Sequence, residues 1–388
     1  MPIRNRLAEM QGDITAWRRH LHQHPELQFD VHETARFVAD KLHAFGVDEV
    51  TEGVGRTGVV GVIKGRGRAG RRIGLRADMD ALPITEATGL DHASTVPGKM
   101  HACGHDGHTA MLLGAAQYLA ETRNFDGDVV LIFQPAEEGG GGGREMVEDG
   151  LMDKWKIDEV YGMHNMPGLP VGQFAIRPGP LLAAADMFTI RIVGRGGHAA
   201  APHQARDPNA AAAHVIVGLQ TICSRTTDPL HSVVVTIGAL HSDSVVGNVI
   251  PHATTLEGTV RALNEDVRAA AQARVIEIAE MTARAQGCTA EIDYEIGYPV
   301  TVNAAENTDY AAEAARAVAG TVEDNCPPIM AAEDFAFMLN ERPGAYIMVG
   351  NGDTAMVHHP EYDFADEAIP AGCSWFVEIV EQRMPLTK

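Results

Sequence analysis

The sequence has few cysteines and few basic residues. Its five cysteines lie far apart among 388 residues, which is not the dense, even-numbered pattern of a disulfide framework, so we expect free thiols in a reducing compartment. Only 31 basic residues stand against 52 acidic ones, and the resulting net charge of −21 repels phosphate backbones and anionic membranes. We therefore expect no nucleic-acid partner.

Long apolar segments are also missing. No stretch approaches about 18 uninterrupted apolar residues, the length from which a membrane-spanning helix is inferred. The opening segment MPIRNRLAEMQGD lacks the apolar core of a signal peptide. We therefore predict a cytoplasmic protein without a membrane partner.

What the sequence does contain is enough apolar material for ordinary hydrophobic cores. Hydrophobic residues make up 45% of the chain and charged residues 21%, a composition that excludes collagen, coiled coil and wholesale disorder. A single core rarely grows beyond about 250–300 residues. The length of 388 residues therefore indicates two or three domains.

The first part of the chain alternates between apolar runs and a helical pattern. Residues 71–78, 128–138 and 158–165 each resemble a buried strand with a polar end, and residues 107–121 have the amphipathic pattern of a helix. This alternation predicts a mostly parallel sheet covered by helices on both faces. Because ligands bind beyond the carboxyl ends of the strands in such sheets, the polar ends are the first place to look for chemistry.

A different pattern occupies the middle of the chain. Half-exposed strands alternate with two helical patterns in the order strand, helix, strand, strand, helix, strand, at residues 188–194, 208–226, 231–240, 253–263, 265–286 and 289–298. Sheet-like sequence returns at residues 344–352, and a C-terminal helix follows from about Ala371.

These patterns predict an α/β protein in which a small two-layer α/β domain is inserted into a larger one. The larger domain would comprise residues 1–181 and 298–388, and the insert residues 182–297. The alternative is two consecutive domains, with the C-terminal part belonging to the second.

The segment HACGHDGH at residues 101–108 contains candidate metal ligands. Cys103 and His105 are two residues apart, so both side chains can point the same way in an extended or turning segment. Thiolate sulfur and imidazole nitrogen are ligands that zinc and its neighbours prefer. The alternative is a polar loop that caps the following helix through Asp106.

Two adjacent carboxylates, Glu137 and Glu138, form the polar end of the strand pattern at residues 128–138, in the segment QPAEEGGGGG. They repel each other unless a cation or a proton resolves the conflict. One can ligate a metal while the other acts as general base, which metal-assisted hydrolysis requires. The alternative is a solvated acidic turn before a flexible glycine run.

Histidines end two further strands. His164 lies in the segment GMHN, and His358 and His359 lie in VHHP. Singly, each is more often a satisfied histidine than a ligand. One thiol, several imidazoles and a carboxylate pair at one edge of one sheet nevertheless match the ligand set of a one- or two-metal hydrolase.

Together these segments closely resemble the M20 metallopeptidase family, and within it the amidohydrolase branch of hippurate hydrolases, N-acyl-amino-acid aminoacylases and auxin-conjugate hydrolases. From Trp17 to Phe376 the matching motifs are, in order, HQHPEL, HACGHDGH, FQPAEEGGGG, MHN, GRGGHAAAPH, AAEDFAFML and HHPEYDF. The resemblance implies a larger domain that carries two metal ions and an inserted domain that serves as lid and dimer contact.

The resemblance also implies roles for single residues. Glu137 would be the general base, and the ligands would be Cys103, His105, Glu138, His164 and His358. The family writes its last ligand as His, a small or polar residue, then Pro, which selects His358 and leaves His359 as the alternative.

One segment departs from the wider family, where a His-x-Asp motif ends an early strand and its His binds metal. Here the segment is RADMD, with Asp78 and Asp80. The amidohydrolase branch is similar at this point, and the resemblance implies that Asp80 takes part in catalysis by orienting a ligand through hydrogen bonding. Asp78 is equally well an ordinary acid at a strand end.

The insert supplies three candidate substrate-binding residues. His198 in GRGGHAA resembles the lid histidine that reaches toward the partner subunit's site and stabilises the oxyanion. Asn248 in GNVIP and Arg261 in GTVRA resemble residues that meet the substrate's carbonyl or carboxylate. An asparagine in a turn and an arginine on a strand are also common without any such role.

The implied reaction is hydrolysis of an N-acyl amino acid to a carboxylic acid and a free amino acid. Glu137 would take a proton from water activated by two divalent ions and then pass it to the leaving amine, while His198 and metal hold the oxyanion. Zinc, nickel, cobalt and manganese all suit the donors. The resemblance further implies a homodimer or higher homo-oligomer formed through the insert.

Two other functions stay open. The same architecture hosts dipeptidases, aminopeptidases and N-acetyl-diaminopimelate deacetylases. A non-catalytic metal-binding homologue is the second alternative, although the intact pair of Glu137 and Glu138 argues against it because a protein without turnover needs no base.

Overall fold

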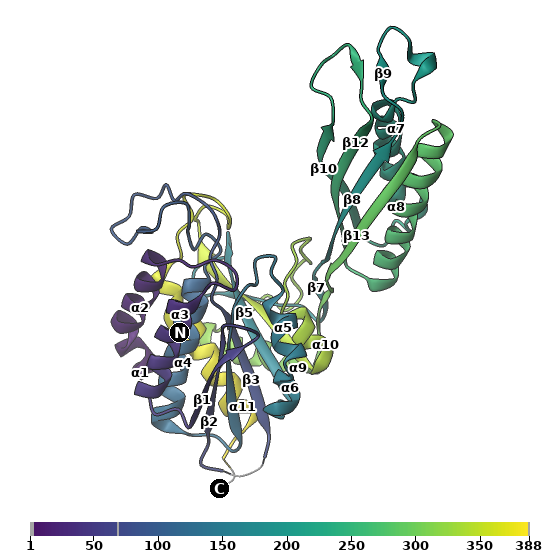
Figure 1. Cartoon of the computed structure of the whole chain (residues 1–388). Coiled ribbons are helices and arrows are strands. Elements are labelled where there is room, and N and C mark those ends of the chain that lie inside the picture. The colour runs from purple at the N-terminus through teal and green to yellow at the C-terminus, as the bar shows by residue number, and fades with distance from the viewer. Residues whose placement is uncertain (1–3, 68–69, 387–388) are drawn as a thin grey trace. The chain divides into compact units, whose positions relative to one another are not determined.

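A seven-stranded sheet forms the centre of the first structural unit of the computed structural model, which describes residues 4–67 and 70–386 (Figure 1). Its spatial order is β1 (Glu49–Val54), β2 (Gly58–Lys64), β4 (Asp128–Gln134), β3 (Arg72–Asp78), β5 (Glu159–Pro167), β15 (Gly344–Gly352) and β6 (Phe174–Ala175). Strands β4, β3, β5 and β15 run parallel, and the outer pairings are antiparallel.

The parallel centre confirms the predicted fold class. Leu75 of β3 lies opposite Leu131 of β4 and Tyr161 of β5. All strands of this centre end at the same edge of the sheet, because parallel strands point the same way. The polar segments that follow β3, β4, β5 and β15 therefore begin at one edge.

Helices cover both faces of this sheet. One side carries α1 (Asn5–Glu9), α2 (Gln11–Gln23), α3 (His32–Ala44), α4 (His105–Thr122), α9 (Ala305–Ala319) and α11 (Ile369–Arg383), and the other carries α5 (Gly142–Glu148), α6 (Leu151–Lys154) and α10 (Ala336–Glu341). The short 3₁₀ helix η3 spans Asp366–Ala368. In β4, Val129, Leu131 and Phe133 join the first core, and Val130 and Ile132 between them are also fully buried. This explains why β4 is apolar without alternation.

The second unit is built around a four-stranded antiparallel sheet. The sheet order is β10 (Val233–Ser242), β12 (Ala253–Ala262), β8 (Ala184–Val193) and β13 (Thr289–Tyr298). Helix α7 (Pro208–Thr221), the π-helix η2 (Ile222–Thr226) and α8 (Glu265–Ala285) pack on it around a core of its own. The order of strands and helices is the one that the sequence predicted.

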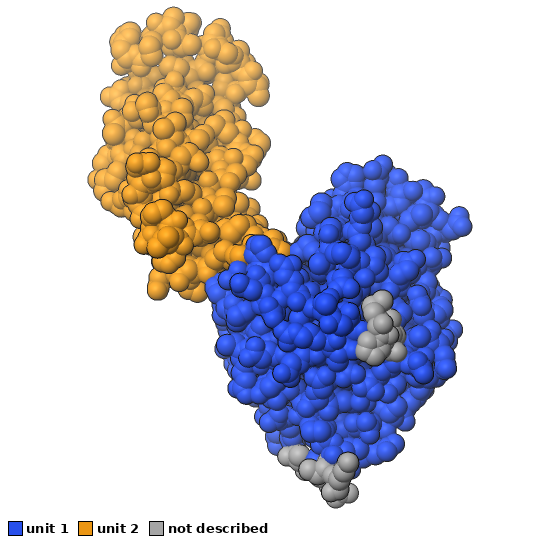
Figure 2. Space-filling model, turned by 180° about the vertical axis from the view of Figure 1, so that it is seen from behind, with its two compact units in different colours: residues 1–181, 302–327, 334–388 blue, residues 182–301, 328–333 orange. Residues whose placement is uncertain are grey.

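Short elements complete the chain. In the second unit β9 (Gly197–His198) pairs with β11 (Val249–Ile250), and a 3₁₀ helix η1 spans Pro202–Gln204. Strands β7 (Gly179–Leu182) and β14 (Thr301–Asn303) form another small sheet. Contacts divide the chain into one unit of residues 1–181, 302–327 and 334–388 and a second of residues 182–301 and 328–333 (Figure 2). Among the helices of the described residues, none is both long and apolar enough to cross a membrane.

Candidate metal centre

Thiol, imidazole and carboxylate side chains gather at the carboxyl edge of the parallel strands. Cys103 and His105 lie at the start of α4, which follows β3 along the chain. Glu137 and Glu138 come just after β4, and His164 lies in the last part of β5. His358 follows β15. The sheet topology thus brings together residues separated by more than 200 positions.

The donor atoms of these residues form three overlapping groups, in each of which all atoms lie within 4.8 Å of one another. The groups are Cys103, His105 and His164; Cys103, Glu138 and His358; and His105, Glu137 and Glu138. Each group has the number of side-chain donors that one divalent ion commonly takes from a protein. Because three donors belong to more than one group, the arrangement suits neighbouring cations rather than a single ion.

Backbone conformation at this edge is unusual. Gly104 has a φ of +86°, and the non-glycine residues Ala136 and His358 have φ values of +53° and +68°. The left-handed conformation costs a non-glycine residue about 1–2 kcal/mol. His358 is held there by a hydrogen bond of 2.7 Å from its N–H to the Ala102 carbonyl. Such strain concentrates at functional sites, where neighbouring contacts enforce it.

The strained backbone directs His358, and not His359, into the cluster. Nε2 of His358 lies 3.2 Å from Oε1 of Glu138, and its contacts with Cys103 and Glu138 raise the pKa of His358 to about 10. His358 and His359 are both exposed, but the ring of His359 accepts a hydrogen bond from the Glu361 N–H instead. The geometry favours His358 as the ligand.

A hydrogen bond to the backbone of Asp80 orients the ring of His105. Its Nδ1 donates to the Asp80 carbonyl at 2.8 Å, which leaves Nε2 facing the cluster. Among the described residues, Nε2 of His105 is buried without a hydrogen bond, and it lies 4.0 Å from Oε1 of Glu138, which itself lies 3.2 Å from Nε2 of His358. Buried polar atoms without partners are costly. A cation between these atoms would satisfy the His105 nitrogen, so the donor set fits a metal.

The pKa values of the candidate ligands depend on their burial and on the groups around them. Burial alone lowers the pKa of His105, but the neighbouring Asp78 carboxylate and Cys103 thiol raise it well above its ordinary value. Burial and the nearby His108 lower the pKa of His164 to about 3. Burial also raises the pKa of the Cys103 thiol. A divalent ion would replace the protons of this cluster and favour the thiolate and neutral imidazoles.

The two aspartates of the RADMD segment have different surroundings. The Asp80 carboxylate accepts hydrogen bonds from the N–H groups of Glu137 and Glu138, at 3.0 and 3.1 Å, and thereby fixes the turn that carries them. Asp78 is fully buried and binds Arg76 and His108, each at 2.6 Å. Asp80 therefore contacts the backbone of the paired glutamates, whereas Asp78 belongs to a buried polar network below the site.

The alternative role for Asp106 is wrong. Helix α4 begins at His105, its N-cap is Gly104, and no side chain caps it. Asp106 lies inside the first turn and accepts a hydrogen bond from Nδ1 of His22 at 2.8 Å. Gly104 takes the left-handed conformation, which glycine adopts readily, and the helix therefore starts two residues too early for Asp106 to be its N-cap.

Sequence reasoning missed the buried residues behind this cluster. His22 and Arg18 on α2 bind Asp106, and Asn165 contacts both His108 and the Cys103 backbone. The motif segments HQHPEL and MHN contain two of these residues, but a polar residue in a motif gives no sign that it is buried.

The candidate substrate-binding residues all lie in the second unit. His198 of β9 is exposed and lies opposite Val249 of β11, and the Asn248 carbonyl accepts a hydrogen bond from the Ala199 N–H. His198 and Asn248 are therefore neighbours. Arg261 lies opposite Ala185 at the start of β8, whereas His198 follows the end of that strand, so the structure does not group Arg261 with them.

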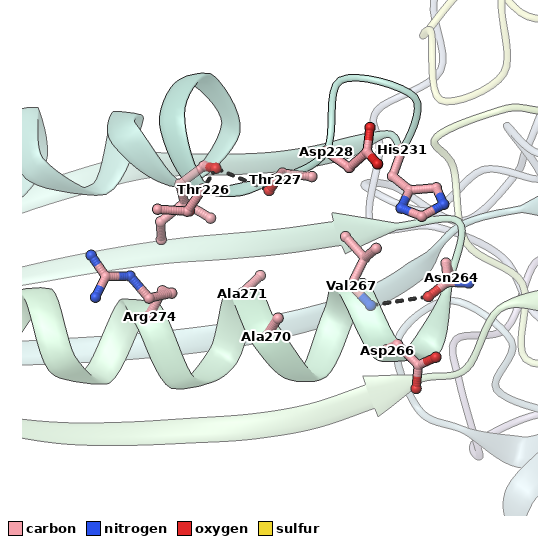
Figure 3. Close-up of a pocket in the computed structure, with 11 residues that line it drawn as sticks. Thr226, Thr227, Asp228, His231, Asn264, Asp266, Val267, Ala270, Ala271 and Arg274 are labelled. Carbon is pink, nitrogen blue, oxygen red and sulfur yellow. Dashed lines mark hydrogen bonds between the residues drawn. The ribbon is translucent and has the colours of Figure 1, made fainter.

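The second unit also contains a pocket of about 440 Å³, and Figure 3 shows the residues that line it. It opens between η2 and the first turns of α8, where its polar lining residues include Asp228, His231 and Arg274. None of the predicted ligands or substrate-binding residues lines it. It carries no part of the candidate metal centre.

Comparisons with known proteins agree with the motifs. Residues 74–382 match the family described as Peptidase family M20/M25/M40. Hippurate hydrolase from Campylobacter jejuni is 42% identical over 96% of this chain and 97% of its own, and N-acetyl-L-cysteine deacetylase from Bacillus subtilis is 41% identical over 94% and 86%. The crystal structure of the YXEP protein from Bacillus subtilis, described as a dinuclear metal binding peptidase, has a TM-score of 0.84 and 36% identity over 97% of this chain and 99% of its own. The predicted resemblance is confirmed.

Proposed function

The chain belongs to peptidase family M20/M25/M40, and from that premise we propose that it is a metal-dependent amidohydrolase of N-acyl amino acids. The proposal rests on one observation: a thiol, imidazoles and paired carboxylates form overlapping ligand groups at one edge of the sheet. Relatives named for the hydrolysis of hippurate and the deacetylation of N-acetyl-L-cysteine support this substrate class.

Two divalent cations would be held by the side chains that share these groups, namely Cys103, His105, Glu138, His164 and His358. When bound, such ions polarise the amide carbonyl and lower the pKa of water toward about 7. The donors combine soft sulfur and nitrogen with hard oxygen, which suits zinc, nickel, cobalt or manganese.

Glu137 is the general base in this proposal. The residue is 7% exposed, and the Asp80 carboxylate binds its backbone N–H and that of Glu138. One glutamate can therefore remain with the cations while the other moves protons. Glu137 accepts a proton from the attacking water and donates it to the nitrogen of the leaving amine. Asp80 holds the backbone of both glutamates through its two carboxylate oxygens.

The second unit would complete the site. We propose that His198 donates a hydrogen bond to the developing oxyanion, and that Asn248 and Arg261 bind the substrate's carbonyl and carboxylate. A homodimer formed through this unit would supply His198 to a neighbouring subunit. We also propose a cytoplasmic location, because all five cysteines lie in the described part of the chain and are free thiols.

A substrate panel tests the function. Acetyl, benzoyl and indoleacetyl amino acids are compared with free dipeptides, each with and without added manganese or zinc. We expect metal-dependent release of the amino acid from at least one acyl class and slow cleavage of dipeptides. Preferential dipeptide cleavage would make the protein a dipeptidase, and no turnover with metal bound would support a non-catalytic homologue.

A further inference from the structure

Asn165 occupies a central place behind the candidate ligands. It follows His164 on β5 and is 1% exposed. Its Nδ2 donates to the Cys103 carbonyl at 2.6 Å, and its Oδ1 accepts from the Tyr362 hydroxyl at 2.8 Å. Its own carbonyl accepts from Nδ1 of His164 at 2.7 Å. Side chain and backbone of one residue are thus tied to two predicted ligands.

These contacts fix the orientation of the Asn165 amide. A carbonyl oxygen can only accept, so the group facing the Cys103 carbonyl must be the NH₂ of the amide. The remaining oxygen then faces the hydroxyl of Tyr362, which can donate. The donor and acceptor pattern leaves no alternative flip with the same number of hydrogen bonds.

His108 supports the same residue from the other side. Its Nδ1 donates to the Asp78 carboxylate at 2.6 Å. Its Nε2 accepts from the Asn165 N–H at 2.9 Å. Both ring nitrogens are therefore occupied. Although Asp78, His105 and His108 lie close enough to hold an ion, the third of these cannot serve as a ligand without breaking this pair.

Close packing leaves Asn165 no freedom. A Cβ atom at Gly104 would lie 2.4 Å from Nδ2 of Asn165 and 2.5 Å from the Tyr362 hydroxyl oxygen. The glycine, which has a φ of +86°, thus allows the backbone between Cys103 and His105 to approach the amide. Any larger residue at this position would push the two segments apart.

We propose that Asn165 is a positioning residue that holds Cys103 and His164 at the spacing needed to share one cation. Sγ of Cys103 lies 3.4 Å from Nε2 of His164, and the amide of Asn165 is the link from the strand of one to the loop of the other. Through Tyr362 it also joins the segment that begins at His358. The inference rests on the proposed metal site, and it assigns to that site a residue that touches neither metal nor substrate.

The variant Asn165→Ala should affect the two ligands Cys103 and His164 differently. It removes the amide's hydrogen bonds with the Cys103 carbonyl and the Tyr362 hydroxyl and its contact with Nε2 of His108. It keeps the backbone contacts of residue 165 to His108 and His164. We therefore expect His164 to stay oriented while Cys103 drifts. Loss of such supporting contacts typically weakens metal binding about 10–100-fold.

Cobalt titration of the full-length, metal-free protein measures this effect. The thiolate-to-cobalt charge-transfer absorption reports whether Cys103 is bound, and competition with a chelator gives the affinity. For Asn165→Ala we expect a weaker charge-transfer band and about 10–100-fold lower affinity for one ion. Neither readout depends on turnover.

The matched control is Asn307→Ala. Asn307 is also buried, and its amide makes two hydrogen bonds at the opposite end of β5, to Glu159 and to the hydroxyl of Tyr161. We expect both variants to lose thermal stability. Asn307→Ala should nevertheless keep the wild-type cobalt affinity and the thiolate charge-transfer band. An equal loss of cobalt binding in both variants would mean that Asn165 has only a structural role, which overturns the inference.

The remaining outcomes are distinguishable. Full cobalt affinity and an unchanged band in Asn165→Ala overturn the inference and leave the metal site intact. A wild-type protein without a thiolate band overturns the metal assignment and the inference with it. If Asn165→Ala does not fold, Tyr362→Phe decides, because it removes only the donor to Oδ1. We expect a smaller loss of affinity in the same direction, and no change would refute the proposal.

Discussion

The buried imidazole of His22 predicts a loss of stability at alkaline pH. Nδ1 of His22 donates to the Asp106 carboxylate at 2.8 Å, and Nε2 lies 3.3 Å from the carboxylate of Glu86. Arg18 approaches Asp106 at 3.5 Å, and the rings of His92 and His101 lie alongside, with centroids 5.6 and 6.3 Å from that of His22. Burial lowers the pKa of His22, but Asp106 and Glu86 outweigh it and raise the pKa to about 9.

The sign and size of the effect follow from this value. Because folding raises the pKa of His22 from 6.5 to about 9, the charged ring stabilises the folded state fully below pH 6.5. That stabilisation is lost as the pH rises through about 9. At about 1.4 kcal/mol for each pH unit between these values, it amounts to about 3 kcal/mol. This is a large part of the stability of an ordinary domain.

The assay compares the wild type with His22→Gln. Glutamine keeps a donor near Asp106 but cannot carry charge. Both proteins are kept metal-free with a chelator, so that bound cations do not contribute to the pH dependence, and their urea unfolding is measured from about pH 6 to about pH 10. We expect the stability advantage of the wild type to shrink by about 3 kcal/mol across this range. An advantage that does not change with pH would refute a charged His22.

Further predictions concern the cluster itself. Glu137→Gln should keep its metal by elemental analysis while kcat falls about 10²–10⁴-fold, since the general base is lost; near-normal turnover would contradict the assignment. Cys103→Ser should lower metal occupancy in the same analysis, because a hydroxyl is a poorer ligand than a thiolate. His358→Ala should lose a metal that His359→Ala keeps, and the reverse result would make His359 the ligand.

Much of the fold could be predicted because burial on both faces leaves a clear signature in the sequence. The predicted strands at residues 128–138 and 158–165 became the central parallel strands β4 and β5, which span residues 128–134 and 159–167. The antiparallel strands at the sheet edges, such as β1 with its mostly exposed residues, have no such signature. A short, exposed strand at an edge is hard to distinguish from a loop.

The site was only partly predictable for a similar reason. Polar residues at the ends of apolar strands attract attention, and the topology then brings them together. Arg18 and Asp106 are 88 positions apart in sequence, and nothing local marks them as a buried pair. Whether Asn165 faces solvent or the Cys103 backbone depends on how β5 and the loop before α4 pack, which no pattern in either segment determines alone.

The most direct test is a crystal structure of the protein loaded with manganese or zinc, with anomalous scattering used to locate the ions. We expect two ions in each chain, one beside Cys103 and His164 and the other near Glu137, with Glu138 close to both. Ions bound elsewhere, or a protein that takes up none at saturating metal, would contradict the account.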